Sequence, residues 1–248
     1  GQRHPTESHS RQSPSWFQEE RSTTLGNVAG QAGTLGQLGN LYAAVLVRPE
    51  EAVTFYRQAV DKYVEVHDDA SEGRMRNNLA NTLCKLRHFD AARQEIRRAI
   101  ECKTQFGHAS APWASWHILA DIETGSGNPD AAAEAKQQAL TAYLAYRRDG
   151  GENHGPDGRI TLAVTQALLS DGPAAAAALL QQAPDFAGAG FPSFIPALHA
   201  IVSGSRDRRL AAAPNLDCTM AAEILLLIET LERGSVPYLF HPSKPFSG

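Results

Sequence analysis

Two runs of apolar residues at three- and four-residue spacing follow one another between Gly73 and Phe106. The first run consists of Leu79, Ala80, Leu83 and Leu86, and the second of Ala92, Ile96, Ala99 and Ile100. Residues at this spacing share one face of an α-helix, so each run predicts an amphipathic helix. The segment between them predicts a short turn in which Asp90 caps the second helix. The stretch as a whole therefore predicts an antiparallel helical hairpin.

The same pattern recurs about 40 residues to either side. The equivalent first-helix positions are Leu38, Leu79 and Leu119, each followed by Gly or Ala, and the equivalent second-helix positions are Ala52, Ala92 and Ala132 with Ala59, Ala99 and Ala139. Helices approach each other closely only where no bulky side chain intervenes, so this register predicts three hairpins that stack in series.

The rest of the chain predicts further helices around this array. Segments 159–169 and 173–183 predict a shorter, degenerate hairpin, and a helix is expected at 193–202. The last helix begins at Asp217 as its N-cap, and its wide apolar face suits a cap over the open end of the array. We therefore predict an all-α fold, an α-solenoid of antiparallel helix hairpins with C-terminal capping helices.

The expected organisation has four parts. Residues 1–15 form a disordered leader or tag, 16–150 the helical repeats, 151–233 the degenerate repeat and capping helices, and 234–248 a flexible tail. The clearest linker is Gly150–Gly158, where glycine and polar residues interrupt the apolar pattern.

These residues resemble the tetratricopeptide repeats, in the longer-period form of kinesin light chains and many bacterial signalling proteins. The resemblance rests on LGNLY at 38–42, RPEEAVTFYRQA at 48–59 and their counterparts in the next two hairpins, and it covers about 34–148. It implies a superhelix whose first helices line a concave, peptide-binding surface. Two positions depart from the pattern: Lys136 stands where a large apolar residue is expected, and Glu123 stands where the first repeat has Tyr42.

Glycines recur through the first predicted helix, between Leu25 and Val47. Each costs about 1 kcal/mol relative to Ala inside a helix. A phosphate-binding loop would need a preceding strand and a Gly-Lys-Ser/Thr sequence, which this segment lacks. Close helix packing or fraying of the helix explains these glycines better.

Composition narrows the range of partners and compartments. The 248 residues carry a net charge of −4, which gives no general case for binding nucleic acid or an anionic membrane. Three unpatterned cysteines favour a reducing, cytoplasmic compartment. The longest apolar run, Ile224–Ile228, is too short to span a bilayer. Because the chain begins with Gly1, we expect a fragment of a larger bacterial signalling protein with an effector domain upstream.

No catalytic constellation is evident in the sequence. The chain lacks the GxSxG, HExxH, CxxC and glycine-lysine motifs of common enzymes and metal sites. Cys84 and Cys102 suit small apolar positions on helices better than a reactive thiol. We therefore predict no enzymatic activity, no cofactor and no bound metal.

The predicted first helices carry polar residues one turn away from the core positions. The expected peptide-binding residues are Asn40, Arg74, Asn77, Asn81, Lys85, His117 and Asp121. Amide side chains can pair with the backbone of an extended peptide, and Arg and Lys select carboxylates. The terminal-carboxylate clamp of the family is incomplete, because Gly36 and Ala114 stand where it has Lys. A protein or peptide partner with an internal acidic segment is therefore expected.

Three other functions stay open at this level. Eight basic residues face three acidic ones between Arg74 and Lys103, the only support for a sensor of a small molecule or nucleic acid. A self-association module is a second alternative, and an enzyme with a reactive thiol is a third. The sequence indicates neither the oligomeric state nor the partner.

Overall fold

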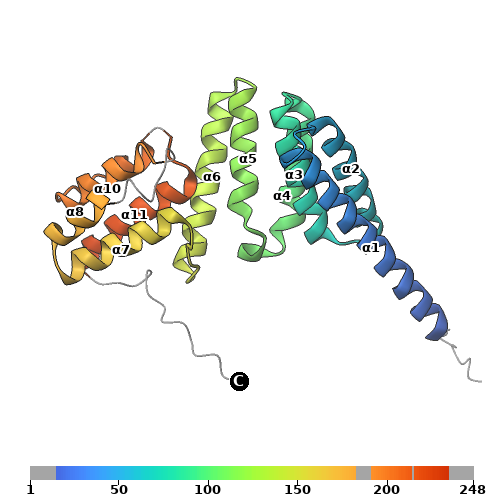
Figure 1. Cartoon of the computed structure of the whole chain (residues 1–248), viewed down its shortest axis with the longest axis horizontal. Coiled ribbons are helices and arrows are strands. Elements are labelled where there is room, and N and C mark those ends of the chain that lie inside the picture. Colours follow the sequence, from blue (N-terminus) through green and yellow to red (C-terminus); the bar gives the residue numbers. More distant parts are fainter. Residues whose placement is uncertain (1–14, 183–190, 214, 235–248) are drawn as a thin grey trace, which may run out of the picture. The chain divides into compact units, whose positions relative to one another are not determined.

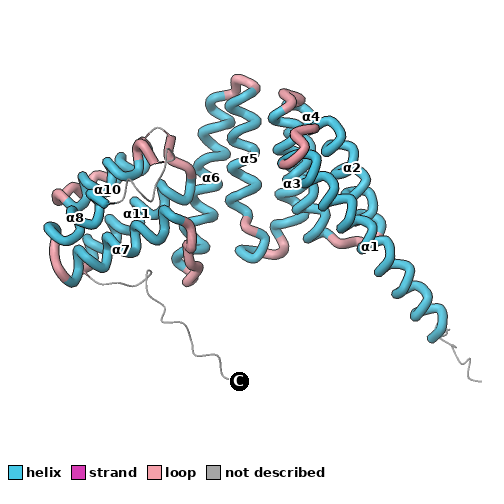
Figure 2. The backbone as a smooth tube through the Cα atoms, viewed as in Figure 1, coloured by secondary structure: helices cyan, strands magenta, loops and turns pink. Residues whose placement is uncertain are grey.

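Every regular element in the part of the chain that the computed structural model describes is a helix (Figures 1 and 2). The structure describes residues 15–182, 191–213 and 215–234, without the side chains of residues 15–23 and 25. The predicted all-α class is therefore confirmed. The predicted leader, up to residue 14, and the tail from residue 235 lie outside the described residues. Within the described helices, none is long and apolar enough to cross a bilayer.

The chain divides into two compact units, 1–102 and 103–248. The first contains α1 (Ser15–Ala44), α2 (Pro49–Glu65), α3 (Asp69–Lys85) and most of α4 (Phe89–Thr104). The second contains η1 (Gly107–Ser110), α5 (Pro112–Gly125), α6 (Pro129–Arg148), α7 (Pro156–Ser170), α8 (Pro173–Gln182), α10 (Phe194–Val202), η3 (Arg208–Ala212) and α11 (Cys218–Arg233). The third predicted hairpin, α5 with α6, thus belongs to the second unit.

Glycines in α1 allow it to lie directly against its neighbours. A Cβ atom at Gly39 would lie 2.5 Å from the ring of Tyr56 in α2, and one at Gly36 would lie 2.7 Å from the sulfur of Met75 in α3. Because these approaches leave no room for a methyl group, close packing is the reason for both glycines. Gly26 and Gly30 have nothing within 4 Å, so this explanation does not extend to the first half of α1.

Helices α3 and α4 form the hairpin predicted at the centre of the chain. Arg76 pairs with Glu95, and Glu72 pairs with Arg98, so the two helices run in opposite directions. Their apolar faces meet at Leu79, Leu83 and Ile96, each at most 1% exposed. The small residues of the repeat register are buried throughout: Ala52, Ala59, Ala92 and Ala99 are 0% exposed, Ala132 is 5% and Ala139 is 1% exposed. The predicted burial of the small residues at 40-residue spacing is therefore confirmed.

The turns between helices recur as regularly as the helices. Positive φ angles occur at residues 47, 67, 87, 107 and 127, each 20 residues after the last. At the end of α3, the N–H of His88 donates to the carbonyl of Leu83, and the N–H of Arg87 donates to the carbonyl of Cys84. Both donor–acceptor distances are 2.9 Å. This is the Schellman arrangement, in which a left-handed residue satisfies the last carbonyls of a helix. The ends of α2 and α5 repeat the same pair of bonds, so α2, α3 and α5 end in the same turn geometry.

The hairpin of α5 and α6 lies within the second unit, with the two helices side by side and joined by a short turn (Figure 1). Glu123 departs from the repeat pattern because it serves this turn. Its carboxylate is buried and accepts a 2.9 Å hydrogen bond from the side chain of Asn128. Trp113 packs edge-on against Tyr143 at 5.2 Å and lies 4.8 Å from Tyr146. These aromatic rings contribute to the packing of α5 against α6.

The remaining helices of the second unit enclose a separate core. Its fully buried residues come from three helices: Phe194 and Leu198 from α10, Leu180 from α8 and Ile224 from α11. Asp217 caps α11, since its carboxylate accepts hydrogen bonds from the N–H groups of Thr219 and Met220. The predicted helix at 193–202 and the predicted cap at Asp217 are therefore confirmed.

Two local predictions are wrong. Asp90 is not an N-cap, because α4 already begins at Phe89 and places Asp90 in its first turn, where it pairs with Arg93 at 2.7 Å. The linker also ends earlier than Gly158, because Pro156 is accepted as the first residue of α7. Proline suits that position since the first N–H groups of a helix have no internal partner.

A buried polar network fastens α6 and α7 to α11. Arg147 pairs with Glu223, and both side chains are nearly inaccessible, at 6% and 0% exposure. Asn153, in the segment before α7, donates to Glu223 at 3.0 Å and to Asp157 at 3.1 Å. Thr219 donates to Asp157 at 2.8 Å. The segment predicted as a simple linker therefore supplies part of the interior.

We predict opposite effects for alanine at two glycines of α1. Gly39→Ala should lower the free energy of unfolding by about 1–3 kcal/mol, because the new methyl group overlaps Tyr56. Gly30→Ala should raise it by up to about 1 kcal/mol, because the space is open and alanine favours helix. Urea unfolding followed by circular dichroism measures both. A stabilising effect at both positions would show that α1 does not approach α2 this closely.

The buried pair of Arg147 and Glu223 predicts that removing the second charge restores stability lost by removing the first. Arg147→Met should destabilise by about 3–5 kcal/mol because it leaves the Glu223 carboxylate buried without its counter-charge. Adding Glu223→Leu should recover most of that loss. Arg148→Met is the control, since Arg148 is 43% exposed and its pair with Glu229 should contribute about 1 kcal/mol or less. Thermal unfolding midpoints of the parent and the three variants measure these effects. A double variant no more stable than Arg147→Met would contradict the buried pair.

Candidate functional site

The exposed face of α3 carries a strip of polar side chains. Four residues at spacings of four, three and four lie on it: Arg74, Asn78, Asn81 and Lys85. At about 100° per residue, these four positions fall within about 60° of one another around the helix. Arg74, Asn81 and Lys85 are exposed and Asn78 is half-buried. We call these four residues the α3 strip.

Asn77, which was expected to face a partner, lies beside the strip and is only 8% exposed. It precedes Asn78 by one residue, which turns it about 100° around the helix toward the buried side. A peptide that lies on the strip would reach Asn78 instead. The sequence could have shown this, because four-residue steps from Arg74 and to Lys85 favour positions 78 and 81 over 77.

Asn40 joins α1 to the α3 strip. Its side-chain oxygen accepts a 2.8 Å hydrogen bond from the hydroxyl of Tyr56 and a 3.1 Å hydrogen bond from the amide of Asn78. The oxygen of Asn40 is therefore committed to the fold. Its NH₂ group is the part that can donate to a peptide carbonyl.

The basic residues of α3 and α4 divide into paired and unpaired sets. Arg76, Arg93 and Arg98 pair with carboxylates of the same unit, and Arg87 lies over the ring of Phe89 at 5.5 Å. Lys85 and Arg97 have no hydrogen-bond or ion-pair partner among the residues that the structure describes. Arg74 contacts only a hydroxyl there, that of Ser71 at 3.3 Å. The local excess of positive charge is thus concentrated on a few exposed side chains, two of them on the α3 strip.

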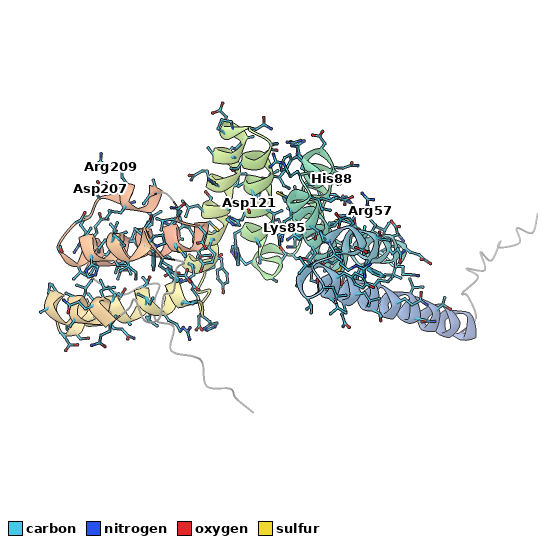
Figure 3. All side chains as sticks on the ribbon, turned by 45° about the horizontal axis from the view of Figure 1, so that its top comes forward. Arg57, Lys85, His88, Asp121, Asp207 and Arg209 are labelled. Atoms are coloured by element: carbon cyan, nitrogen blue, oxygen red, sulfur yellow. The ribbon has the colours of Figure 1, made fainter. Side chains whose placement is uncertain are left out.

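His117 and Asp121 belong to the second unit and lie one turn apart on α5. Their nearest nitrogen and oxygen atoms are 3.9 Å apart, and both side chains are about half exposed. Figure 3 labels Lys85 on α3 and Asp121 on α5. The expected residues on α1 and α3 therefore belong to the first unit, and those on α5 belong to the second. His117 in addition borders a cleft with Lys136, a residue that we did not predict as a site residue.

A group of potential metal ligands in the first unit has another role. Asp69, Glu72 and Cys102 place one ligand atom each within 4.8 Å of one another. Burial, with a contribution from the Glu72 carboxylate, raises the pKa of the Cys102 thiol to about 11. Glu72 already faces two guanidinium groups, those of Arg76 and Arg98. This donor set suits ion pairing better than a metal cation.

Glu72 is the most enclosed carboxylate of this group, at 2% exposure. Its burial favours the neutral acid, but hydrogen bonds from Arg76 and Cys102 and the charges of Arg76 and Arg98 outweigh burial and lower the pKa of Glu72 below 4.5. The charged form therefore stabilises the fold. This contribution is complete above the pKa of the unfolded chain and is lost as the pH falls through the lower pKa of the folded chain.

We predict that Glu72→Gln lowers the free energy of unfolding at pH 7 by about 3 kcal/mol, because it removes the buried charge that pairs with both Arg76 and Arg98. The variant should also lose less stability than the parent as the pH falls below 4.5. Glu101→Gln is the control, because Glu101 is 66% exposed and its pair with Arg98 should contribute about 0.5 kcal/mol. Urea unfolding across acidic pH measures both effects. Parallel pH profiles for the parent and Glu72→Gln would contradict this role of Glu72.

Comparison with known proteins yields no relative for this chain. No family model matches the sequence, and no curated protein and no solved structure gives a significant match.

Proposed function

We propose that the chain is a non-catalytic scaffold or adaptor that binds an acidic peptide or partner-protein segment along its first helices. The α3 strip is the observation that carries this proposal. It presents two exposed cations and an exposed amide on one face of one helix, and that face is not needed for the core.

The side chains of the α3 strip suit an extended acidic segment. Lys85 and Arg74 can each meet a carboxylate, and the amide of Asn81, which has no partner among the described residues, offers both a donor and an acceptor to a peptide backbone. Asn40 and Asn78 are hydrogen-bonded to each other, so they are held in place before a partner arrives. Such pre-organisation reduces the entropy lost on binding.

The proposed architecture is a tetratricopeptide-like α-solenoid. The buried alanines at 40-residue spacing and the turn geometry at 20-residue spacing both support it. The three free cysteines favour a cytoplasmic protein, and the resemblance to bacterial repeat proteins favours part of a larger signalling protein.

The role of the α3 strip is tested by charge reversal. We expect peptides selected from a random displayed library on the parent chain to be rich in Asp and Glu. Arg74→Glu with Lys85→Glu should weaken the selected peptides by at least about tenfold, equal to about 1.4 kcal/mol. Arg57→Glu with Arg97→Glu is the matched control, because both residues are exposed and it makes the same change in net charge. Fluorescence anisotropy with the labelled peptide gives the affinities.

Two results would argue against this site. Equal weakening by both double variants would show a general charge effect instead of recognition by the α3 strip. Selected peptides without an acidic bias would place the binding surface elsewhere. All variants are first compared by circular dichroism, so that a loss of folding is not mistaken for a loss of binding.

A further inference from the structure

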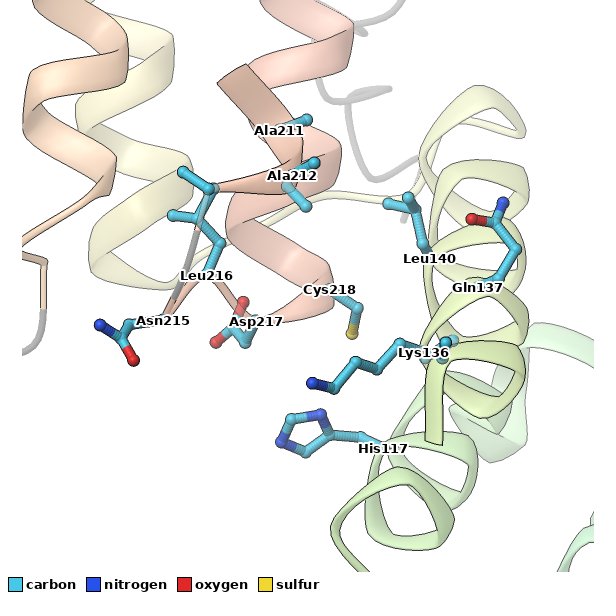
Figure 4. Close-up of a pocket in the computed structure, with 14 residues that line it drawn as sticks. His117, Lys136, Gln137, Leu140, Ala211, Ala212, Asn215, Leu216, Asp217 and Cys218 are labelled. Atoms are coloured by element: carbon cyan, nitrogen blue, oxygen red, sulfur yellow. The ribbon is translucent and has the colours of Figure 1, made fainter. Parts of the chain in front are cut away.

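The second unit contains an open cleft with a volume of about 380 Å³ (Figure 4). Helix α6 forms one wall, and residues 211–213, 215–218 and 221 form the other. His117 of α5 lies at one end. In Figure 4 the side chain of Lys136 extends from α6 across the opening, toward Asp217 and Cys218. The volume falls within the range of small-molecule sites.

The walls of the cleft are apolar and built mostly from small side chains. Ala139 and Leu140 contribute from α6, and Ala212, Leu216 and Ala221 contribute from the opposite wall. Alanines leave the space open instead of filling it, so a compact apolar group can lie between the two walls. Burial of that group away from water would supply much of the affinity.

The polar groups of the cleft carry a bias toward anions. Lys136 is exposed and has no hydrogen-bond or ion-pair partner in the part of the chain that the structure describes. The imidazole of His117, at one end of the cleft, can donate a hydrogen bond to the same anion as Lys136.

Among the described residues that line the cleft, Asp217 is the carboxylate, and one of its two oxygens is occupied. An oxygen of Asp217 accepts hydrogen bonds from the N–H of Thr219 at 2.9 Å, the hydroxyl of Thr219 at 2.8 Å and the N–H of Met220 at 2.8 Å. Its negative charge also faces the positive end of α11. Burial and the charge of Asp217 raise the pKa of the neighbouring Cys218 thiol to about 12, so the thiol is neutral. Lys136 is therefore the charged group of the cleft that has no hydrogen-bond or ion-pair partner in the described part of the chain.

We propose that this cleft binds a small carboxylate with a compact apolar body. The carboxylate meets the ammonium group of Lys136 and the imidazole of His117, and the apolar body lies between α6 and the start of α11. This goes beyond the proposed function, because it concerns the second unit alone and does not depend on the α3 strip. It also gives a reason for Lys136, which replaces an apolar residue of the repeat pattern.

The test uses hexanoate as the probe, with 1-hexanol and hexylamine as analogues of equal chain length. Amide chemical shifts of the ¹⁵N-labelled chain are followed during titration at millimolar probe. We expect hexanoate to shift the amides of Lys136, Leu216, Cys218 and Ala221 in a saturable manner. Hexanol should bind at least about tenfold more weakly, because it lacks the charge that pairs with Lys136, and hexylamine should give no saturable shift.

Two variants separate the charge from the space. Lys136→Gln should weaken hexanoate by about tenfold while leaving the affinity for hexanol unchanged, and Arg97→Gln, which removes one exposed positive charge from the first unit, should change neither. Ala133→Phe, at an exposed position on the α6 wall, should abolish the binding of both by filling the cleft. Equal affinities for hexanoate and hexylamine, an unchanged affinity in Lys136→Gln, or shifts scattered outside the cleft would overturn the proposal. Peptide binding to the α3 strip is measured separately, so either proposal can fail without the other.

Discussion

Close approach of helices at small residues is the constraint on which the packing depends. A helix pair separated by a bulky side chain cannot also bury its neighbouring leucines, because interiors are packed without large voids. The alanines at 52, 92 and 132, and at 59, 99 and 139, satisfy this requirement with one spacing, and Gly39 satisfies it where the ring of Tyr56 replaces a smaller neighbour. Once these contacts are fixed, larger residues such as Leu79 and Ile96 fill the remaining space between the helices and are buried there.

Periodicity predicted the helices because it is a direct consequence of this constraint, whereas the turns left less trace in the sequence. The left-handed positions include His67 and Arg87 as well as Gly127, so no single residue type marks them. The regular hydrogen bonds at these turns come from backbone groups, which the sequence does not reveal. The same limit explains the error at Asp90, whose residue type suits a cap but which lies two residues after the cap position, His88.

The candidate site was predictable to the extent that helix geometry alone decides exposure. Arg74, Asn81 and Lys85 are exposed as expected, because they lie opposite the leucines of α3. Asn77 is buried because it stands nearer the side of the helix that packs on a neighbour, and that side depends on tertiary contacts. Which cations are free also depends on the fold. Arg76 and Arg98 look like Lys85 in the sequence, yet both are held by Glu72.

Departures from the repeat pattern are the more informative positions once the fold is known. Glu123 replaces an aromatic residue because its carboxylate organises the turn to α6, which makes that departure structural. Lys136 has no such internal partner in the described part of the chain, and it borders open space lined by alanines. A charge at a position where the pattern wants an apolar side chain costs packing and gains nothing from within the unit. The proposed ligand, with its own negative charge and its own apolar surface, is complementary both to Lys136 and to the apolar walls around it.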